Sequence, residues 1–156
     1  GGLQLLGERL LDPDGVESSD PEMCCLGLLP LKTVMRRAKT LRRTRAYLPE
    51  GKELNGYEIH HGETVSMESG VPEIRDKTGR AVGFVRGNCF TTYLHGMFDD
   101  DRFRRSWLDR LRVAKGWTPK GGVTARYGVE EALNRLADHV RSRIDIEQLY
   151  RKMGVR

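Results

Sequence analysis

The sequence predicts a layered α/β domain, with helices at both ends of a strand-rich middle. Strand-like runs follow one another between about residue 26 and residue 95, and apolar residues recur at helical spacing before and after them. The chain has 156 residues, which is enough for one domain with a buried core and also fits a piece of a larger enzyme.

The first helix is expected in residues 1–11, because apolar residues recur there at helical spacing, at Leu3, Leu6 and Leu10. A cluster of Asp, Pro and Gly then ends this helix and opens a polar loop, residues 12–22. Three strands are expected after the loop, in residues 26–35, 39–48 and 55–65. Residues 80–95 are typical of a hairpin whose second arm ends on His95.

Helices are expected after the hairpin. The acidic residues 99–101 provide the N-cap and first-turn carboxylates that favour a helix start. A buried stripe is predicted on this helix, at Phe103, Trp107 and Leu111. A later helix from Val129 carries its apolar residues on one face, at Leu133, Leu136, Val140 and Ile144, and Asp145 is expected to cap a last turn that contains Leu149 and Met153.

The composition narrows the function classes. The net charge is +5, and six cations lie in residues 36–45; without interleaved aromatic residues or a nucleic-acid-binding motif, a solvated strand face is favoured over a nucleic-acid footprint. No apolar run approaches the ~18–20 residues that span a bilayer, and no secretion signal opens the chain. The cysteines, Cys24, Cys25 and Cys89, form no CxxC pair, which favours small buried thiols in a reducing, cytoplasmic setting over disulfides or a zinc ribbon.

Histidines are the candidate catalytic side chains. His95 ends a strand and Gly96 follows it, which is where open α/β sheets place functional groups. Cys89 lies on the same strand face, but six residues separate the two by about 20 Å, so it is excluded as the nucleophile that His95 serves. Adjacent His60 and His61 point to opposite strand faces, so no metal site is expected, and Gly62 is expected at a pocket rim.

Three separated motifs resemble those of the class I (triad-type) glutamine amidotransferases. GGLQLLG is similar to the part of their C-x-G-x-Q elbow that follows the cysteine, HHGETV to their glutamine-pocket turn, and YLHG to the strand that ends on their catalytic histidine. More narrowly, GYEIHHGET, TTYLHGMFDDDRFR and LNRLADHVRSRIDIEQLY are similar to the C-terminal amidotransferase domain of the cobyric acid synthase family.

This resemblance implies a three-layer, flavodoxin-like amidotransferase domain, of which residues 1–156 are the C-terminal part. The N-terminal strands, the nucleophilic cysteine and the ATP-dependent synthetase domain would lie outside the chain. The implied roles are an oxyanion-hole N–H at Gly1, glutamine binding by Gln4, His60 and Gly62, and general acid–base catalysis by His95. Most of the class carries Glu two residues after this histidine, where this chain has Met97, as in the cobyric acid synthase branch; Glu58 and residues 99–101 are candidates to orient His95 instead.

The implied function is to release ammonia from glutamine for the ATP-dependent amidation of corrinoid carboxylates, those of adenosylcobyrinic acid a,c-diamide, in cobalamin biosynthesis. The fragment alone is expected to be inactive, because the cysteine would precede Gly1. No cofactor or metal is expected in this chain, which has no G-x-x-x-x-G-K-S/T loop; ATP and Mg²⁺ are expected in the synthetase domain. The expected partners are glutamine, that synthetase domain and the corrinoid, and neither nucleic acid nor membrane is expected.

Two alternatives stay open at this point. One is another cobyrinate-type amidotransferase, such as a cobyrinic acid diamide synthase or a cell-wall lipid amidotransferase. The other is a degenerate amidotransferase-like module that binds a partner and catalyses nothing. The residue that precedes Gly1 in the gene separates enzyme from degenerate module, because only cysteine supplies the thiolate.

Overall fold

The structure is a computed structural model that describes residues 1–155. Eight strands and four α-helices make up this part of the chain, with one 3-10 helix, η1, between them. In chain order they are α1 (Gly2–Leu6), β1 (Arg9–Leu11), β2 (Glu22–Cys24), β3 (Leu31–Tyr47), β4 (Glu53–Ser66), β5 (Glu73–Asp76), β6 (Ala81–Arg86), β7 (Cys89–Thr92), β8 (Leu94–His95), η1 (Met97–Asp99), α2 (Asp101–Ala114), α3 (Val129–Arg141) and α4 (Ile146–Met153).

All eight strands belong to one mixed sheet. Its main order is β2-β1-β3-β5-β6-β7, with β4 paired to β3 and β8 paired to β4. The β1–β3 pair is parallel and the other pairs are antiparallel. A mixed sheet with helices confirms the predicted α/β class and is consistent with part of a flavodoxin-like domain.

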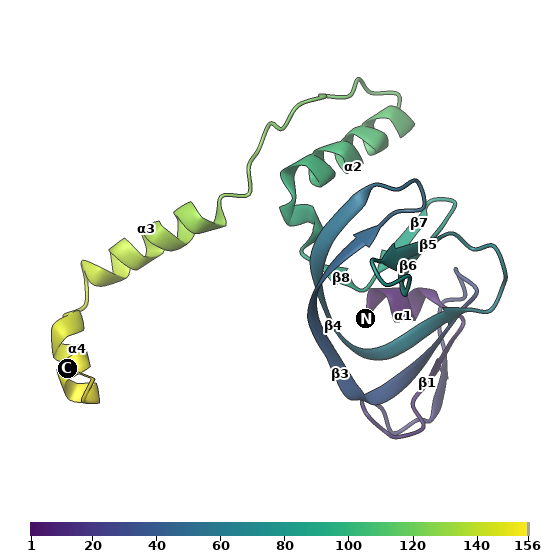
Figure 1. Cartoon of the computed structure of the whole chain (residues 1–156), viewed down its shortest axis with the longest axis horizontal. Coiled ribbons are helices and arrows are strands. Elements are labelled where there is room, and N and C mark those ends of the chain that lie inside the picture. Colours follow the sequence, from purple (N-terminus) through teal and green to yellow (C-terminus); the bar gives the residue numbers. More distant parts are fainter. Residues whose placement is uncertain (156) are drawn as a thin grey trace.

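The longest feature is the antiparallel ribbon of β3 and β4, which curves around α1 (Figure 1). The sequence predicts two strands in residues 26–35 and 39–48, but β3 is one strand of 17 residues, from Leu31 to Tyr47. The pairing of β3 with β4 shifts register between Met35 and Thr40. The two predicted strands are therefore one strand with a β-bulge between them.

The N-terminal segment also differs from its prediction. The helix α1 ends at Leu6, and residues 9–11 form strand β1 beside β3. Gly7 is the reason for the break: it is extended, and a Cβ atom there would lie 2.8 Å from the Leu31 carbonyl oxygen. This close approach turns the chain out of the helix and into the sheet, so the leucine at position 10 pairs in a strand.

The core consists of two apolar clusters on the concave side of the ribbon. One lies around Ile74, Val82 and Leu94 and includes Phe103 of α2; the other lies around Leu31 and contains Leu3, Leu29, Phe84 and Tyr93. Alternate residues of the strands supply both clusters, as the period of a strand requires.

The turn of the hairpin and the helix caps match the sequence expectations. Strands β6 and β7 pair with a turn at Gly87, but β7 ends at Thr92, and β8, which ends on His95, pairs with β4, so the second arm of the predicted hairpin is divided into two strands. Asp100 caps α2 by accepting from the backbone N–H groups of Arg102 and Phe103, and Asp145 caps α4. The stripe predicted on α2 is only partly buried, because Phe103 is buried whereas Leu111 is 51% exposed.

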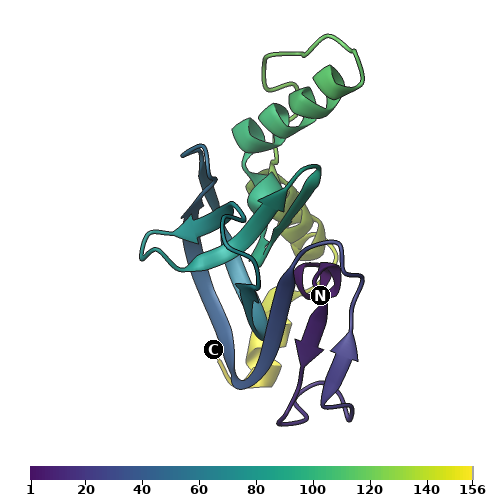
Figure 2. The ribbon, with the colours of Figure 1, turned by 90° about the vertical axis from the view of Figure 1, so that its right-hand side faces the viewer.

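The last two helices, α3 and α4, extend away from the sheet after an irregular segment that follows α2 (Figure 1). In the view turned by 90° they lie behind the sheet (Figure 2). The apolar residues predicted on one face of α3 are exposed to solvent. Within residues 1–155, no helix combines the length and the apolar character needed to cross a membrane.

Candidate functional site

The first candidate residues lie at the start of α1. Gln4 is buried, its side-chain oxygen accepts from the Gly1 amine at 3.1 Å, and its Nε2 lies 3.6 Å from the Met35 sulfur. Gly62 of β4 faces this amide so closely that a Cβ atom there would lie 2.4 Å from Gln4 Nε2. The predicted pocket-rim glycine is therefore packed against Gln4, and a larger residue at this position would displace the amide.

An aromatic stack continues this cluster along the inner face of the sheet. The His60 and Tyr93 rings are parallel within 13°, with centroids 3.7 Å apart. The Tyr93 hydroxyl contacts the Thr64 hydroxyl at 2.5 Å, and Thr64 in turn contacts Thr33 at 2.7 Å. Burial is the main cause that raises the pKa of Tyr93, so its hydroxyl stays protonated. Hydroxyl contacts thus run from Thr33 through Thr64 to Tyr93, and the Tyr93 ring in turn stacks on the His60 imidazole.

His60 is held at both ring nitrogens by acceptors. Its Nδ1 lies 2.7 Å from the Gly62 carbonyl oxygen, and its Nε2 lies 3.0 Å from a Glu58 carboxylate oxygen. A carbonyl and a carboxylate only accept hydrogen bonds, so both contacts are hydrogen bonds when the imidazole carries a proton on each nitrogen. The two contacts therefore fix the orientation of the ring.

Glu58 is a carboxylate that accepts hydrogen bonds from four different residues. Its side chain is fully buried and accepts from Thr44 at 2.6 Å, from Arg80 at 2.6 and 2.8 Å, and from Arg42 at 3.1 Å, besides the His60 bond. Burial opposes its ionisation, but the hydrogen bonds from His60, Thr44 and Arg42 outweigh burial and hold the pKa of Glu58 below its ordinary value.

A second carboxylate closes this network into a ring. Asp76 accepts from Arg42 at 3.3 Å and from Arg80 at 3.1 Å, so two carboxylates alternate with two guanidinium groups. Thr78 binds the other Asp76 oxygen through its backbone N–H and its hydroxyl. The ring ties β3 and β4 to the turn between β5 and β6.

His95 lies elsewhere. It ends β8 with an exposed side chain, and its ring stacks on Tyr57 with centroids 5.3 Å apart and planes 18° apart. Gly96 then adopts a left-handed conformation (φ 72°), which lets the chain turn into η1. Among residues 1–155, no hydrogen bond to the His95 ring is present.

The structure thus brings together four of the five predicted site residues. Gly1, Gln4, Gly62 and His60 form one connected cluster, and no direct contact joins His95 to it within the described residues. Glu58, a candidate to orient His95, instead binds His60, because it alternates with Tyr57 along β4 and faces the other side of the strand.

The acidic candidates at the start of α2 have their own partners. Asp100 caps the helix, and Asp101 accepts from Arg104 and from the Tyr127 backbone N–H, bonds that lower the pKa of Asp101. Asp99 lies beside Gly96: a Cβ atom on that glycine would be 3.1 Å from an Asp99 oxygen.

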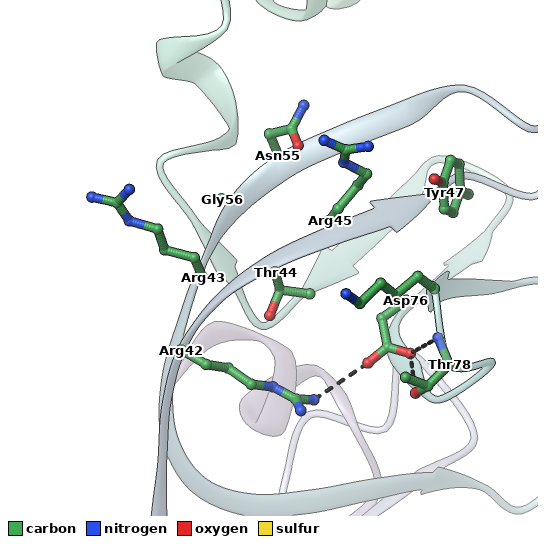
Figure 3. A pocket seen from close by; sticks show the side chains of 10 residues that line it. Arg42, Arg43, Thr44, Arg45, Tyr47, Asn55, Gly56, Asp76 and Thr78 are labelled. Carbon is green, nitrogen blue, oxygen red and sulfur yellow. Dashed lines mark hydrogen bonds and ion pairs between the residues drawn. The ribbon is translucent and has the colours of Figure 1, made fainter.

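The basic stretch is largely neutralised by neighbouring carboxylates. Four of its cations are in ion pairs: Arg36 with Glu63, Arg37 with Asp14, Arg42 with Glu58 and Asp76, and Arg45 with Glu53. A cavity of about 560 Å³ adjoins Arg42, Arg43 and Arg45, but these side chains point in three different directions (Figure 3). This arrangement supports the solvated strand face over a convergent anion site.

The cysteines are free thiols. Cys89 packs against the second apolar cluster, and burial raises the pKa of Cys25. Cys24, in the short edge strand β2, is exposed, so the prediction of three buried thiols is wrong for this residue; Cys25 and Cys89 are partly buried. Within residues 1–155, no group of three His, Cys, Asp or Glu side chains is arranged to hold a metal ion.

Sequence reasoning missed two features. The carboxylate–guanidinium ring joins residues from β3, β4 and the β5–β6 turn, and the one signal for it is a charged residue, Glu58, at an inward position of β4. The stack of Tyr57 on His95 depends on the register between β4 and β8, for which no sequence signal exists.

Comparison with known proteins places the chain in one family of amidotransferase domains. The profile of the CobB/CobQ-like glutamine amidotransferase domain matches residues 1–103. A protein from Leptospira interrogans named adenosylcobalamin biosynthesis bifunctional protein CobDQ is 37% identical over 99% of this chain and 18% of its own length. Cobyric acid synthases from Nitratidesulfovibrio vulgaris and Carboxydothermus hydrogenoformans are 40% and 35% identical over 99% of this chain, and over 35% and 33% of their own lengths. The chain thus spans a minor part of each of these relatives.

Proposed function

Since the chain belongs to the family of CobB/CobQ-like glutamine amidotransferase domains, we propose that it is the glutaminase portion of a cobyric acid synthase. In this role it releases ammonia from glutamine, and the ammonia amidates carboxylates of adenosylcobyrinic acid a,c-diamide. The observation that carries the proposal is that Gly1, Gln4, His60 and Gly62, distant in sequence, form one contact cluster.

The proposed chemistry begins with a thiolate supplied by the residue before Gly1 in the longer protein. The thiolate attacks the glutamine side-chain amide carbon, and the Gly1 N–H stabilises the resulting oxyanion. His95 gives a proton to the departing nitrogen, ammonia leaves, and a thioester forms. His95 then takes a proton from water, and the resulting hydroxide hydrolyses the thioester to glutamate and releases the thiolate, which restores the starting pair of thiolate and protonated imidazole.

The remaining cluster residues have supporting roles in this proposal. Gln4 is buried and accepts from the Gly1 nitrogen, so it holds the turn at the start of α1, and the Gly1 N–H exchanges this acceptor for the oxyanion during the reaction. His60 is fixed by Gly62 and Glu58 and presents a rigid edge to the glutamine pocket. In this proposal the fixed imidazole of His60 binds glutamine, and proton transfer is assigned to His95.

The partners belong to the longer protein. The relatives are several times longer than the aligned region, which supports a synthetase portion that uses ATP and Mg²⁺ and receives the ammonia. The proposed setting is the cytoplasm. Arg43 and Lys39 are the two cations of the basic stretch that form no ion pair within residues 1–155, and Arg43 also lines the cavity beside Arg42 and Arg45, so Arg43 is proposed to meet that portion or its polyacidic substrate; unchanged amidation after Arg43→Glu would remove this part of the proposal.

The names of the relatives favour this function over the two alternatives, since they denote cobyric acid synthases rather than diamide synthases, lipid amidotransferases or inactive modules. A cysteine codon directly before Gly1 is expected in the gene. Serine or alanine there would support the degenerate module instead.

The test is a comparison of glutamine and ammonium as nitrogen donors for the full-length protein. His95→Ala is expected to abolish glutamine-dependent amidation and to spare amidation from added ammonium. His61→Ala is the matched control, because this histidine faces the opposite side of β4 from His60 and bonds the Arg36 carbonyl; both activities should persist. Equal loss of both activities in His95→Ala would make His95 structural.

A second measurement concerns the 156-residue chain alone. It is expected to release no ammonia from glutamine, because the nucleophile is proposed to lie outside it. Ammonia release above background would overturn the assignment of the nucleophile.

A further inference from the structure

We propose that Tyr57 is the residue that positions the His95 imidazole, by stacking on the face of the ring instead of binding its edge. The inference rests on the proposed function of His95 and deepens it. It answers a question that the sequence raises, since Met97 stands where most of the amidotransferase class has a carboxylate.

The contact is built into the sheet. Tyr57 of β4 is directly opposite His95 of β8 in an antiparallel pair, so both side chains leave the same face of the sheet. The rings are 18° from parallel at 5.3 Å, the geometry that aromatic pairs prefer. Gly96, which follows His95, leaves room for the Tyr57 ring, because a Cβ atom on Gly96 would lie 3.2 Å from that ring. Its backbone is also left-handed (φ 72°), a conformation that residues with side chains rarely adopt.

No carboxylate competes for this task in the described part of the chain. Glu58 faces the opposite side of β4, Asp100 caps α2, and Asp101 binds Arg104. Asp99 approaches Gly96 but forms no hydrogen bond with the His95 ring. The stack on Tyr57 is the one side-chain interaction of that ring within residues 1–155.

Face-on support has a specific consequence. A carboxylate at the ring edge occupies one nitrogen and selects a tautomer, whereas a stacked ring restricts rotation about the side chain and leaves both nitrogens open. His95 can then receive a proton from one side and release it toward the departing ammonia without first breaking a bond.

Kinetics of the full-length protein test the proposal. Tyr57→Leu removes the ring but keeps apolar bulk at a residue that is 45% exposed, so the core is untouched. We expect kcat for glutamine hydrolysis to fall about five- to tenfold, the loss typical of one aromatic pair, with KM within about twofold and ammonium-dependent amidation unchanged. Tyr57→Phe keeps the stack and is expected to retain kcat within about twofold.

The matched control is Tyr47→Leu. Tyr47 is 37% exposed on the same face of the β3–β4 ribbon but lies opposite Glu53, so its loss should leave kcat unchanged. A fall in Tyr57→Phe as large as in Tyr57→Leu would overturn the stacking role in favour of the hydroxyl. A large fall in Asp99→Asn would overturn it in favour of a carboxylate.

A second readout does not depend on the proposed function. In the chain itself, the NMR signals of the His95 ring protons should carry the ring-current shift of Tyr57, lose it in Tyr57→Leu, and keep it in Tyr57→Phe and Tyr47→Leu. If His95→Ala keeps glutamine hydrolysis while these shifts behave as expected, the proposed function fails and the stack stands. Unchanged shifts in Tyr57→Leu would refute the stack itself.

Discussion

Replacing Glu58 with Gln should destabilise the fold more than any other single charge removal in β4. The substitution keeps the shape of the side chain but removes the charge and points an amide N–H₂ at groups that donate. Removing one partner of a buried ion pair costs about 3–5 kcal/mol. Arg42 and Arg80 are 46% and 37% exposed and can regain water, so the expected loss is about 2–3 kcal/mol.

Urea unfolding at pH 7 measures this loss: the urea concentration at the midpoint should fall, while the slope of the unfolding free energy against urea concentration should not change. Glu53→Gln is the control from the same strand: Glu53 is 43% exposed and pairs with Arg45 at 3.4 Å, so its loss should cost less than about 1 kcal/mol. If Glu58→Gln were as stable as Glu53→Gln, the carboxylate–guanidinium ring would contribute nothing to the fold, and the interpretation of Glu58 as a structural anchor would be wrong.

Three further predictions follow from the same contacts. Because the folded-state pKa of Glu58 lies below its ordinary value of 4.5, its stabilisation is complete above that pH and is lost as the pH falls through the folded-state pKa; in urea titrations the stability gap between wild type and Glu58→Gln should therefore be constant above pH 4.5 and shrink as the pH is lowered further. Gly62→Ala should cost about 1–3 kcal/mol by overpacking Gln4, 2.4 Å away, whereas Gly122→Ala, with no neighbour within 4 Å, should cost under about 1 kcal/mol in the same assay. Asp100→Ala should lower the free energy of unfolding by about 1 kcal/mol, measured by thermal melting, because two N–H groups of α2 lose their acceptor.

Local patterns predicted the parts of the structure that depend on neighbours in sequence. The turn between β6 and β7, the cap at Asp100 and the cap at Asp145 each depend on a few adjacent residues and are confirmed. The opposite orientations of His60 and His61 follow from the period of a strand and are confirmed as well.

Contacts between distant strands could not be predicted in this way. The length of the first helix was wrong because Gly7 packs on Leu31, a contact across 24 positions that no helical pattern encodes. The prediction that Glu58 is a candidate to orient His95 was wrong, because the sequence alone does not show which face of β4 meets His95. The register between β4 and β8 decides the stack of Tyr57 on His95, and register is a property of the assembled sheet. The bond between Glu58 and His60 lies within β4, where the period of two puts both side chains on one face.

Transfer of labelled nitrogen tests the central claim most directly. The full-length protein would be given glutamine labelled with ¹⁵N at its side-chain amide, together with ATP, Mg²⁺ and the corrinoid diamide, and the ¹⁵N content of the amidated product would be measured. The account predicts label in the product of the wild type and none in that of His95→Ala, while unlabelled ammonium supports amidation by both. Label transfer by His95→Ala at the wild-type rate, or none by the wild type, would contradict it.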